Sequence, residues 1–196
     1  MGTINSIQEK GMAYGLTDDG RLDRELVAQT SPRYRAPKIR NGKTRYVPFA
    51  KTFGLCRDRE DRRQNAYVAT NAGFGAISVR VKSQFWKMIE FKENRSPLLM
   101  CVHPTLKDPD LVIKKGEDYH FYKSFYQGEG KNGKDRIFSM ISVCKPQENG
   151  EMALMTNYIV YRENKIARAL KGEMGNVVYQ KPLPSNKKKL GQTLSK

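Results

Sequence analysis

The second half of the sequence alternates short apolar runs with turn signals, and this pattern limits the possible folds most. The segments 119–126, 136–145 and 152–162 follow one another with turns between them, one of which is Asn149-Gly150. Asn-Gly is a strong hairpin signal because both residues accept positive φ. We therefore expect an α+β fold, in which one antiparallel, sheet-dominated domain of meander or barrel-like form is accompanied by one or two helices and a basic β-hairpin arm.

Shorter patterns on both sides of this meander predict the remaining elements. The segment 77–81 alternates apolar and polar residues, which is typical of a strand with one face in water. Apolar residues recur at helical spacing within 21–29, and Ser83 is a suitable N-cap for a helix from 84 to about 93. Four further segments are expected as strands, namely 98–102, 111–113, 166–170 and 176–180.

Composition shifts along the chain divide it into four parts. An N-terminal segment (1–30) contains more acids than bases. A basic hairpin or arm with a charged loop (31–65) follows it. The antiparallel sheet core is expected at 66–181, and 182–196 is expected to be a disordered basic tail, since it is rich in lysine and contains no acid.

The basic arm centres on the stretch from Arg33 to Lys51. This stretch contains seven Lys and Arg and no acid, and Asn41-Gly42 lies near its middle. The Asn-Gly pair predicts a β-hairpin, which would present cations and aromatic rings together. Such a ribbon is suited to a nucleic-acid surface.

The charge of the chain favours a polyanionic partner. Lys and Arg number 36 against 20 Asp and Glu, which gives a formal net charge of +16 and a pI of about 9.8. A field of this sign attracts nucleic acid and speeds the encounter with it. Single-stranded DNA or RNA is favoured, because no recognition helix for a groove is visible. Self-association, an anionic membrane surface and an acidic protein remain as alternatives.

The aromatic segment 119–126 is a candidate platform for base stacking. As a strand it places Tyr119, Phe121, Lys123 and Phe125 on one face. His120, Tyr122, Ser124 and Tyr126 lie on the other, which we expect to be the wet side. The alternative is that both faces are buried in the core.

These patterns together select the residues expected to bind nucleic acid. Cations from the arm, the 77–82 strand and the tail would contact phosphates, and tyrosines would stack on bases. The set is Arg33, Tyr34, Arg35, Lys38, Arg40, Lys43, Arg45, Tyr46, Arg80, Lys82, Tyr122, Tyr126, Lys187, Lys188 and Lys189. No catalytic residue, metal or cofactor is expected in this non-enzymatic function.

A first rival function is a metal-dependent nuclease. Pro109-Asp110 followed by Glu129-Gly130-Lys131 resembles the outline of the Pro-Asp…Glu-x-Lys nuclease superfamily. The resemblance implies that Asp110 and Glu129 hold a metal, with the lysine helping to position the attacking water. Here, however, Glu-x-Lys falls in a glycine-rich stretch, whereas that superfamily has it on a buried strand.

A second rival is a viral or phage structural or assembly protein, or an inhibitor that docks on an acidic host protein. Both would use the same basic charge. The three cysteines are far apart and form no Cys-x-x-Cys pair, which is typical of a reducing compartment. Together with the lack of a long apolar run, this predicts a cytoplasmic protein, or a nuclear one in a eukaryote.

Overall fold

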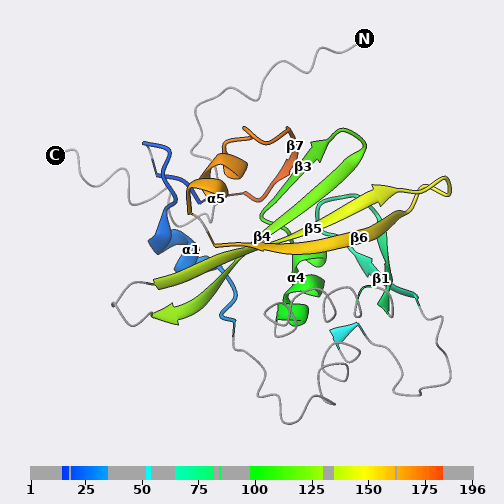
Figure 1. Cartoon of the computed structure of the whole chain (residues 1–196), viewed down its shortest axis with the longest axis horizontal. Coiled ribbons are helices and arrows are strands. Elements are labelled where there is room, and N and C mark those ends of the chain that lie inside the picture. The colour runs from blue at the N-terminus through cyan, green and yellow to red at the C-terminus, as the bar shows by residue number, and fades with distance from the viewer. Residues whose placement is uncertain are drawn as a thin grey trace.

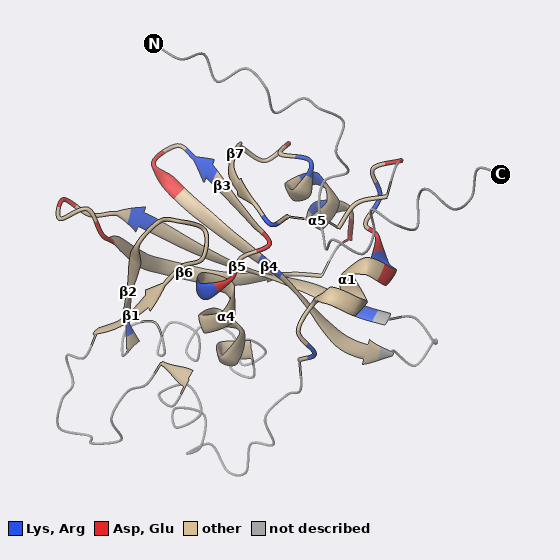
Figure 2. Cartoon of the chain, turned by 180° about the vertical axis from the view of Figure 1, so that it is seen from behind, with Lys and Arg blue, Asp and Glu red and all other residues tan. Residues whose placement is uncertain are grey.

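The structure is a computed structural model and describes residues 15–17, 19–34, 52–53, 65–81, 84, 98–129, 135–161 and 163–182. Within these ranges three helices lie against one sheet, seen from opposite sides in Figures 1 and 2. The strands are β1 (Asn65–Ala69), β2 (Ala76–Arg80), β3 (Leu111–Lys115), β4 (Asp118–Glu129), β5 (Asp135–Pro146), β6 (Met152–Val160) and β7 (Asn176–Gln180). The helices are α1 (Arg24–Thr30), α4 (Val102–Lys107) and α5 (Glu163–Leu170).

The seven strands form a single open sheet in the order β1-β2-β6-β5-β4-β3-β7. Neighbouring strands are antiparallel except β2 and β6, which run parallel. β1 and β7 lie at opposite edges. The predicted α+β class with one antiparallel-dominated sheet is therefore confirmed, while its barrel-like form is wrong, because the sheet does not close on itself.

The central strands β4, β5 and β6 are the predicted meander. β4 and β5 pair from Tyr119 opposite Cys144 to Glu129 opposite Asp135, which makes a long two-stranded ribbon. β5 and β6 are joined through the predicted Asn-Gly turn, in which Gly150 has a φ of 80° and the Gln147 amide donates to the Glu151 carbonyl over 2.7 Å.

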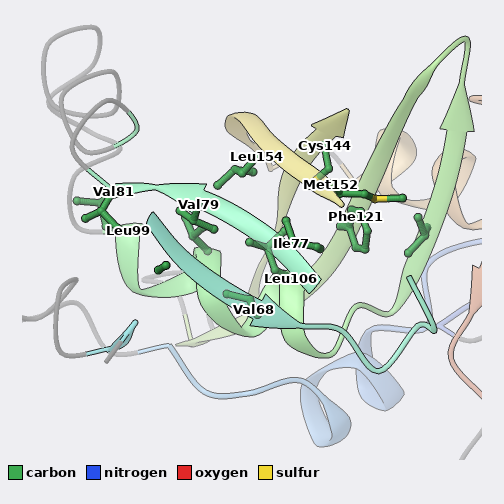
Figure 3. Packing of buried hydrophobic residues seen from close by; sticks show 13 residues of the cluster. Val68, Ile77, Val79, Val81, Leu99, Leu106, Phe121, Cys144, Met152 and Leu154 are labelled. Carbon is green, nitrogen blue, oxygen red and sulfur yellow. The ribbon is translucent and has the colours of Figure 1, made fainter. Parts of the chain in front are cut away.

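One face of the sheet packs against α4. Alternate residues of β1 and β2, among them Val68, Ile77 and Val79, join Leu106 of α4 and Phe121 of β4 in one apolar cluster (Figure 3). Several of these side chains are fully buried. At about 25 cal/mol per Å² of apolar surface, burial of this kind is the main stabilising contribution to the sheet.

The opposite face packs against α1 and α5. Leu22 and Val27 from the N-terminal part join Ile166 and Leu170 of α5 over Tyr122 and its neighbours in the sheet. Phe121 and Tyr122 are adjacent in β4 and enter different clusters, because successive residues of a strand point to opposite faces. Both faces of the middle of β4 are thus covered.

Two predicted strands have a different structure. Residues 163–170 form α5, because Ile166, Ala167, Ala169 and Leu170 recur at helical spacing and are buried together. Residues 98–101 form a short 3₁₀ turn leading into α4. The strand expected at 176–180 is present as β7, but it pairs with β3 rather than with 166–170.

The helix expected within 21–29 is present as α1. Asp23 caps it, since the Leu26 amide donates to the Asp23 carboxylate over 2.9 Å. The helix predicted at 84–93 lies outside the described residues apart from Gln84. No helix in the described ranges is long and apolar enough to cross a bilayer.

Candidate nucleic-acid interface

A row of four side chains crosses the part of the sheet that lies away from α1 and α5. Tyr67 of β1 is opposite Ser78 of β2, Ser78 is beside Ala153 of β6, and Ala153 is opposite Lys145 of β5. We call Tyr67, Ser78, Ala153 and Lys145 the open row. With strands about 4.8 Å apart, its two ends are about 14 Å apart.

The side chains of the open row all point away from α4. Their chain neighbours Val68, Ile77, Leu154 and Cys144 are in the α4 cluster, so alternation places the open row on the opposite face. Figure 1 shows β1 at the end of the sheet distant from α1 and α5. The open row is therefore on the same face as α1 and α5, but these two helices cover a different part of it, around Tyr122.

The open row combines an exposed ring, small residues and a cation. Tyr67 is 58% exposed, an unusual amount for a tyrosine within a strand. Lys145 is exposed and lies 3.4 Å from Glu117, whose side chain is also exposed, so this ion pair contributes little. Ser78 and Ala153, which lie between Tyr67 and Lys145 in the row, have short side chains. They therefore rise less above the sheet than the Tyr67 ring and the Lys145 ammonium group.

Arg80 adds a second cation beside Tyr67. It is opposite Asn65 in the β1–β2 register, two residues from the Tyr67–Ser78 pair, and it is exposed. Such diagonal neighbours on one face have Cβ atoms roughly 7–8 Å apart, within reach of long side chains. The exposure of Arg80 agrees with the wet outer face expected for this strand, while its role in binding stays a prediction. The sequence did not select Tyr67, its aromatic neighbour in the register.

Arg33 and Tyr126 form a cation–aromatic contact near the far end of β4. The Tyr34 amide donates to the Tyr126 carbonyl over 2.7 Å, which fixes 32–34 against the strand edge. The Arg33 guanidinium carbon lies 5.8 Å from the centre of the Tyr126 ring. Arg33 is exposed and Tyr126 half-buried. The acid-free basic stretch thus begins at a fixed point on the sheet.

Tyr34 and Tyr122 are buried, contrary to the exposure that stacking on a base requires. Tyr34 is 7% exposed, and its ring meets that of Phe138 edge-on at 5.6 Å. Tyr122 is 6% exposed under the helices of the second face, and this burial raises its pKa. The expectation that 120–126 presents a wet face is wrong at Tyr122, since α1 and α5 cover it there. Tyr34 fixes the start of the arm in the core.

The remaining predicted site residues lie outside the described residues. They are Arg35, Lys38, Arg40, Lys43, Arg45, Tyr46, Lys82, Lys187, Lys188 and Lys189. The expected hairpin at Asn41-Gly42 and the tail lie outside them too.

The distribution of charge along the chain separates the sheet from these segments. The described residues contain 14 Lys and Arg and 13 Asp and Glu, a formal charge of +1, and Figure 2 shows the two signs interspersed. The whole chain has 36 and 20, so 22 Lys and Arg and 7 Asp and Glu are in the rest of the sequence. Nearly all of the net charge, +15 of +16, therefore belongs to sequence outside the described sheet and helices.

The two carboxylates of the nuclease outline are not brought together. Asp110 precedes β3, where its Oδ2 accepts from the Ser124 amide over 2.8 Å. Glu129 pairs with Asp135 at the far end of β4, five residues beyond Ser124. Along a strand the backbones of Ser124 and Glu129 are therefore about 16 Å apart, so the fold does not bring the Asp110 and Glu129 positions together. The described residues contain no cluster of three or more metal-ligand side chains.

Asp110 instead belongs to a buried network of charges with Asp108, Lys123 and Lys181. The Lys123 ammonium lies 3.1 Å from Asp108 and 3.5 Å from Asp110, and Lys181 donates to Asp108 over 2.8 Å. Burial raises the pKa of Asp110, against the attraction of Lys123. Partial burial would also raise the pKa of Asp108, but hydrogen bonds from Lys181 and Lys123 outweigh it and lower that pKa. These contacts join the segment before β3 to β4 and to Lys181, which is a structural role.

Both histidines are half-buried and lie in different parts of the fold. His103 packs edge-on against Phe53, and His120 is 3.5 Å from the Tyr158 hydroxyl. Burial lowers the pKa of both imidazoles. Among the described residues, His103 contacts an aromatic ring and His120 a phenol hydroxyl, and neither contact is the acid or base that hydrolysis would require.

Comparisons with known proteins identify no relative. No family model matches the sequence, and neither a curated protein nor a solved structure matches it significantly. The site residues themselves are therefore the basis for any functional inference.

Proposed function

We propose that this protein binds single-stranded nucleic acid without acting on it as an enzyme. The observation that carries the proposal is the distribution of charge: the described sheet, helices and turns have a net charge of +1, whereas residues 35–51 carry six cations and residues 182–196 carry four, with no acid in either stretch. A fold does not need such an excess for its own stability, because like charges repel. The closely spaced negative phosphates of nucleic acid are complementary to this excess of positive charge.

In this proposal the acid-free stretch from Arg33 to Lys51 contacts the phosphate backbone. Arg33 is the first cation of this stretch, and it is held at the edge of β4 beside the Tyr126 ring. The tail lysines 187–189 add affinity of the same sequence-independent kind.

The open row would supply contacts to bases. Tyr67 offers a ring face on which a base can stack, and Lys145 and Arg80 are cations on the same face. Stacking of this kind needs unpaired bases, which favours single strands over duplexes. We propose Tyr67 for base stacking in place of Tyr122 and Tyr34, because those two rings are buried.

Two described cysteines support a reducing compartment. Cys101 and Cys144 are buried free thiols, and burial raises the pKa of each, so little of either is present as reactive thiolate. We propose a cytoplasmic or nuclear location on this ground.

The first experiment measures binding by fluorescence anisotropy. Labelled single- and double-stranded DNA and RNA of equal length are titrated with the protein at fixed salt, with and without Mg²⁺. We expect single strands to bind more tightly than duplexes and to stay intact in Mg²⁺. Absence of binding at low salt would exclude this function and favour an acidic protein partner. Cleavage in Mg²⁺ that is lost in Asp110→Asn would support the nuclease instead.

A further inference from the structure

A cleft separates the N-terminal turn from α5. Its volume is about 540 Å³. One wall is made by Thr17, residues 20–22 and Arg24, and the other by one face of α5 and by Lys171. Leu22 of one wall and Ile166 of α5 belong to the same buried apolar cluster, which fixes the two walls relative to each other. A cleft of this size is within the range of small-molecule sites, about 300–1,000 Å³.

The lining of the cleft contains four cations and one acid, and two further carboxylates, Asp19 and Glu173, pair with Arg21 and Arg168. Arg21 and Arg24 come from the N-terminal side, Arg168 from α5 and Lys171 from the turn after it, and Glu163 is the single acid among the lining residues. The side-chain amide of Asn164, an uncharged hydrogen-bond donor, lies beside them. A concave site with this composition is complementary to an anion with several oxygens.

Three of the four cations are oriented by exposed carboxylates. Arg24 pairs with Glu163, Arg21 with Asp19, and the Arg168 Nε donates to Glu173 over 2.9 Å. Pairs this exposed are weak, so they orient a guanidinium without preventing it from binding a stronger anion. The Arg168 bond to Glu173 uses Nε, which leaves the two Nη groups of the guanidinium for a bidentate contact.

Lys171 is the cation that has no carboxylate partner among the described residues. It lies close against Gly20, where an added Cβ would be 2.8 Å from the lysine Cε and 2.9 Å from its Nζ. Gly20 also has a φ of 74°, a conformation that favours glycine. The turn therefore makes room for the Lys171 ammonium at the wall of the cleft.

We propose that this cleft binds a phosphorylated ligand through a di- or triphosphate group, with Lys171 and Arg168 as the principal contacts. The phosphates could belong to a free nucleotide or to the 5′ end of a nucleic-acid strand, and both present the same chemistry. The site does not depend on the nucleic-acid surface proposed above, since it shares no residue with the open row or the basic stretch.

Isothermal titration with inorganic pyrophosphate at constant ionic strength tests the site. The wild type should bind one pyrophosphate per chain, and Arg168→Gln and Lys171→Gln should each weaken the affinity about tenfold, as expected for loss of one charged hydrogen bond. Lys165→Gln is the matched control, because Lys165 is an exposed lysine of α5 that does not line the cleft. It should bind like the wild type.

Two further ligands distinguish the source of the phosphates. ADP should bind with the affinity of pyrophosphate or better if a free nucleotide is the ligand. An oligonucleotide with a 5′-triphosphate should bind more tightly than its 5′-hydroxyl form if a strand end is the ligand, and Lys171→Gln should abolish that difference. Lys171→Gln should leave binding of the 5′-hydroxyl strand unchanged, so the two proposals fail separately.

The proposal is overturned by absence of saturable pyrophosphate binding to the wild type. Equal weakening by Lys165→Gln and Lys171→Gln would also overturn it, since only general charge would then matter. Circular dichroism of each variant verifies that the fold is retained.

Discussion

Tyr67 and Tyr161 are similarly exposed, at 58% and 59%, but have different surroundings. Tyr67 is in the open row, with cations on the same face of the sheet. Tyr161 follows β6, and its ring lies 6.0 Å from that of Phe138. The two residues allow the contribution of a ring in the open row to be separated from that of an exposed ring in general.

Tyr67→Ser should weaken single-stranded DNA binding by roughly 5- to 150-fold, the equivalent of about 1–3 kcal/mol for one stacked base. The thermal midpoint should change little, because the ring is mostly in solvent. Anisotropy titration measures the affinity, and Tyr161→Ser serves as the control with wild-type binding. Equal affinities for the two variants would remove the open row from the interface.

Lys123 neutralises the charge of Asp110 and Asp108 next to it. Its side chain is 4% exposed, and the two carboxylates beside it are its counter-charges. Lys123→Met should lower the free energy of unfolding by about 3–5 kcal/mol, because it leaves the buried Asp110 carboxylate without its partner. Urea denaturation measures this loss.

Lys115→Met is the control for that loss, because Lys115 is an exposed lysine of the neighbouring strand β3. Its effect should stay within about 0.5 kcal/mol. A similarly small effect of Lys123→Met would show that the network does not stabilise the fold.

The edge strand β7 is tied to the sheet by side chains as well as by its ladder. Lys181 directly follows the strand; its amide donates to the Asp110 carbonyl over 2.9 Å, and its ammonium donates to Asp108. The residue after a C-terminal edge strand is thereby joined to the segment before β3. This tie should depend on pH, since one of its members is a carboxylate.

Asp108→Asn tests that dependence. Hydrogen bonds from Lys181 and Lys123 outweigh partial burial and hold the pKa of Asp108 below its ordinary 3.8 in the native state. The unfolded state therefore binds the proton more readily. The stabilisation is fully present above about pH 5 and is lost as the pH falls through and below the unfolded pKa.

The difference in unfolding free energy between wild type and Asp108→Asn should be larger near about pH 6 than near about pH 3. Urea titrations at both values measure it. Glu148→Gln, in the exposed β5–β6 turn, corrects for general effects of acid. A difference that does not change with pH would exclude the lowered pKa as a source of stability.

The elements that sequence alone could predict are those with a long, regular pattern. The meander strands β4, β5 and β6 alternate over many residues and have an Asn-Gly turn, so their type and order were predictable. The segment 166–170 was too short to distinguish strand from helix by periodicity, and it became part of α5. The length of the regular pattern, rather than its composition, decided whether the type of an element could be predicted.

The site was less predictable, because exposure depends on distant parts of the chain. Tyr122 has the pattern of a wet-face residue, but α1 and α5, from opposite ends of the sequence, cover it. Tyr67 stands between Ala66 and Val68, and that alternation would have indicated an outward ring in the strand. No local pattern shows that α1 and α5, which cover the face at Tyr122, do not extend over Tyr67.

Over the whole chain, the separation of a near-neutral sheet from cationic sequence is the central claim. It predicts that affinity for nucleic acid depends on the basic stretch far more than on cations of the sheet. A fold whose exposed cations all acted alike would show no such preference. The two possibilities differ in how binding responds to salt.

The most direct test is the slope of log affinity against log salt concentration for single-stranded DNA. Arg35, Lys38 and Arg40 are changed to Glu in one variant. Lys107, Lys115 and Lys165, three exposed cations of the described elements, are changed to Glu in the control, which has the same net charge. Loss of three phosphate contacts should reduce the slope by about 2 in the first variant, at about 0.7 per contact, and leave it nearly unchanged in the control. Equal slopes for the two variants would contradict the account.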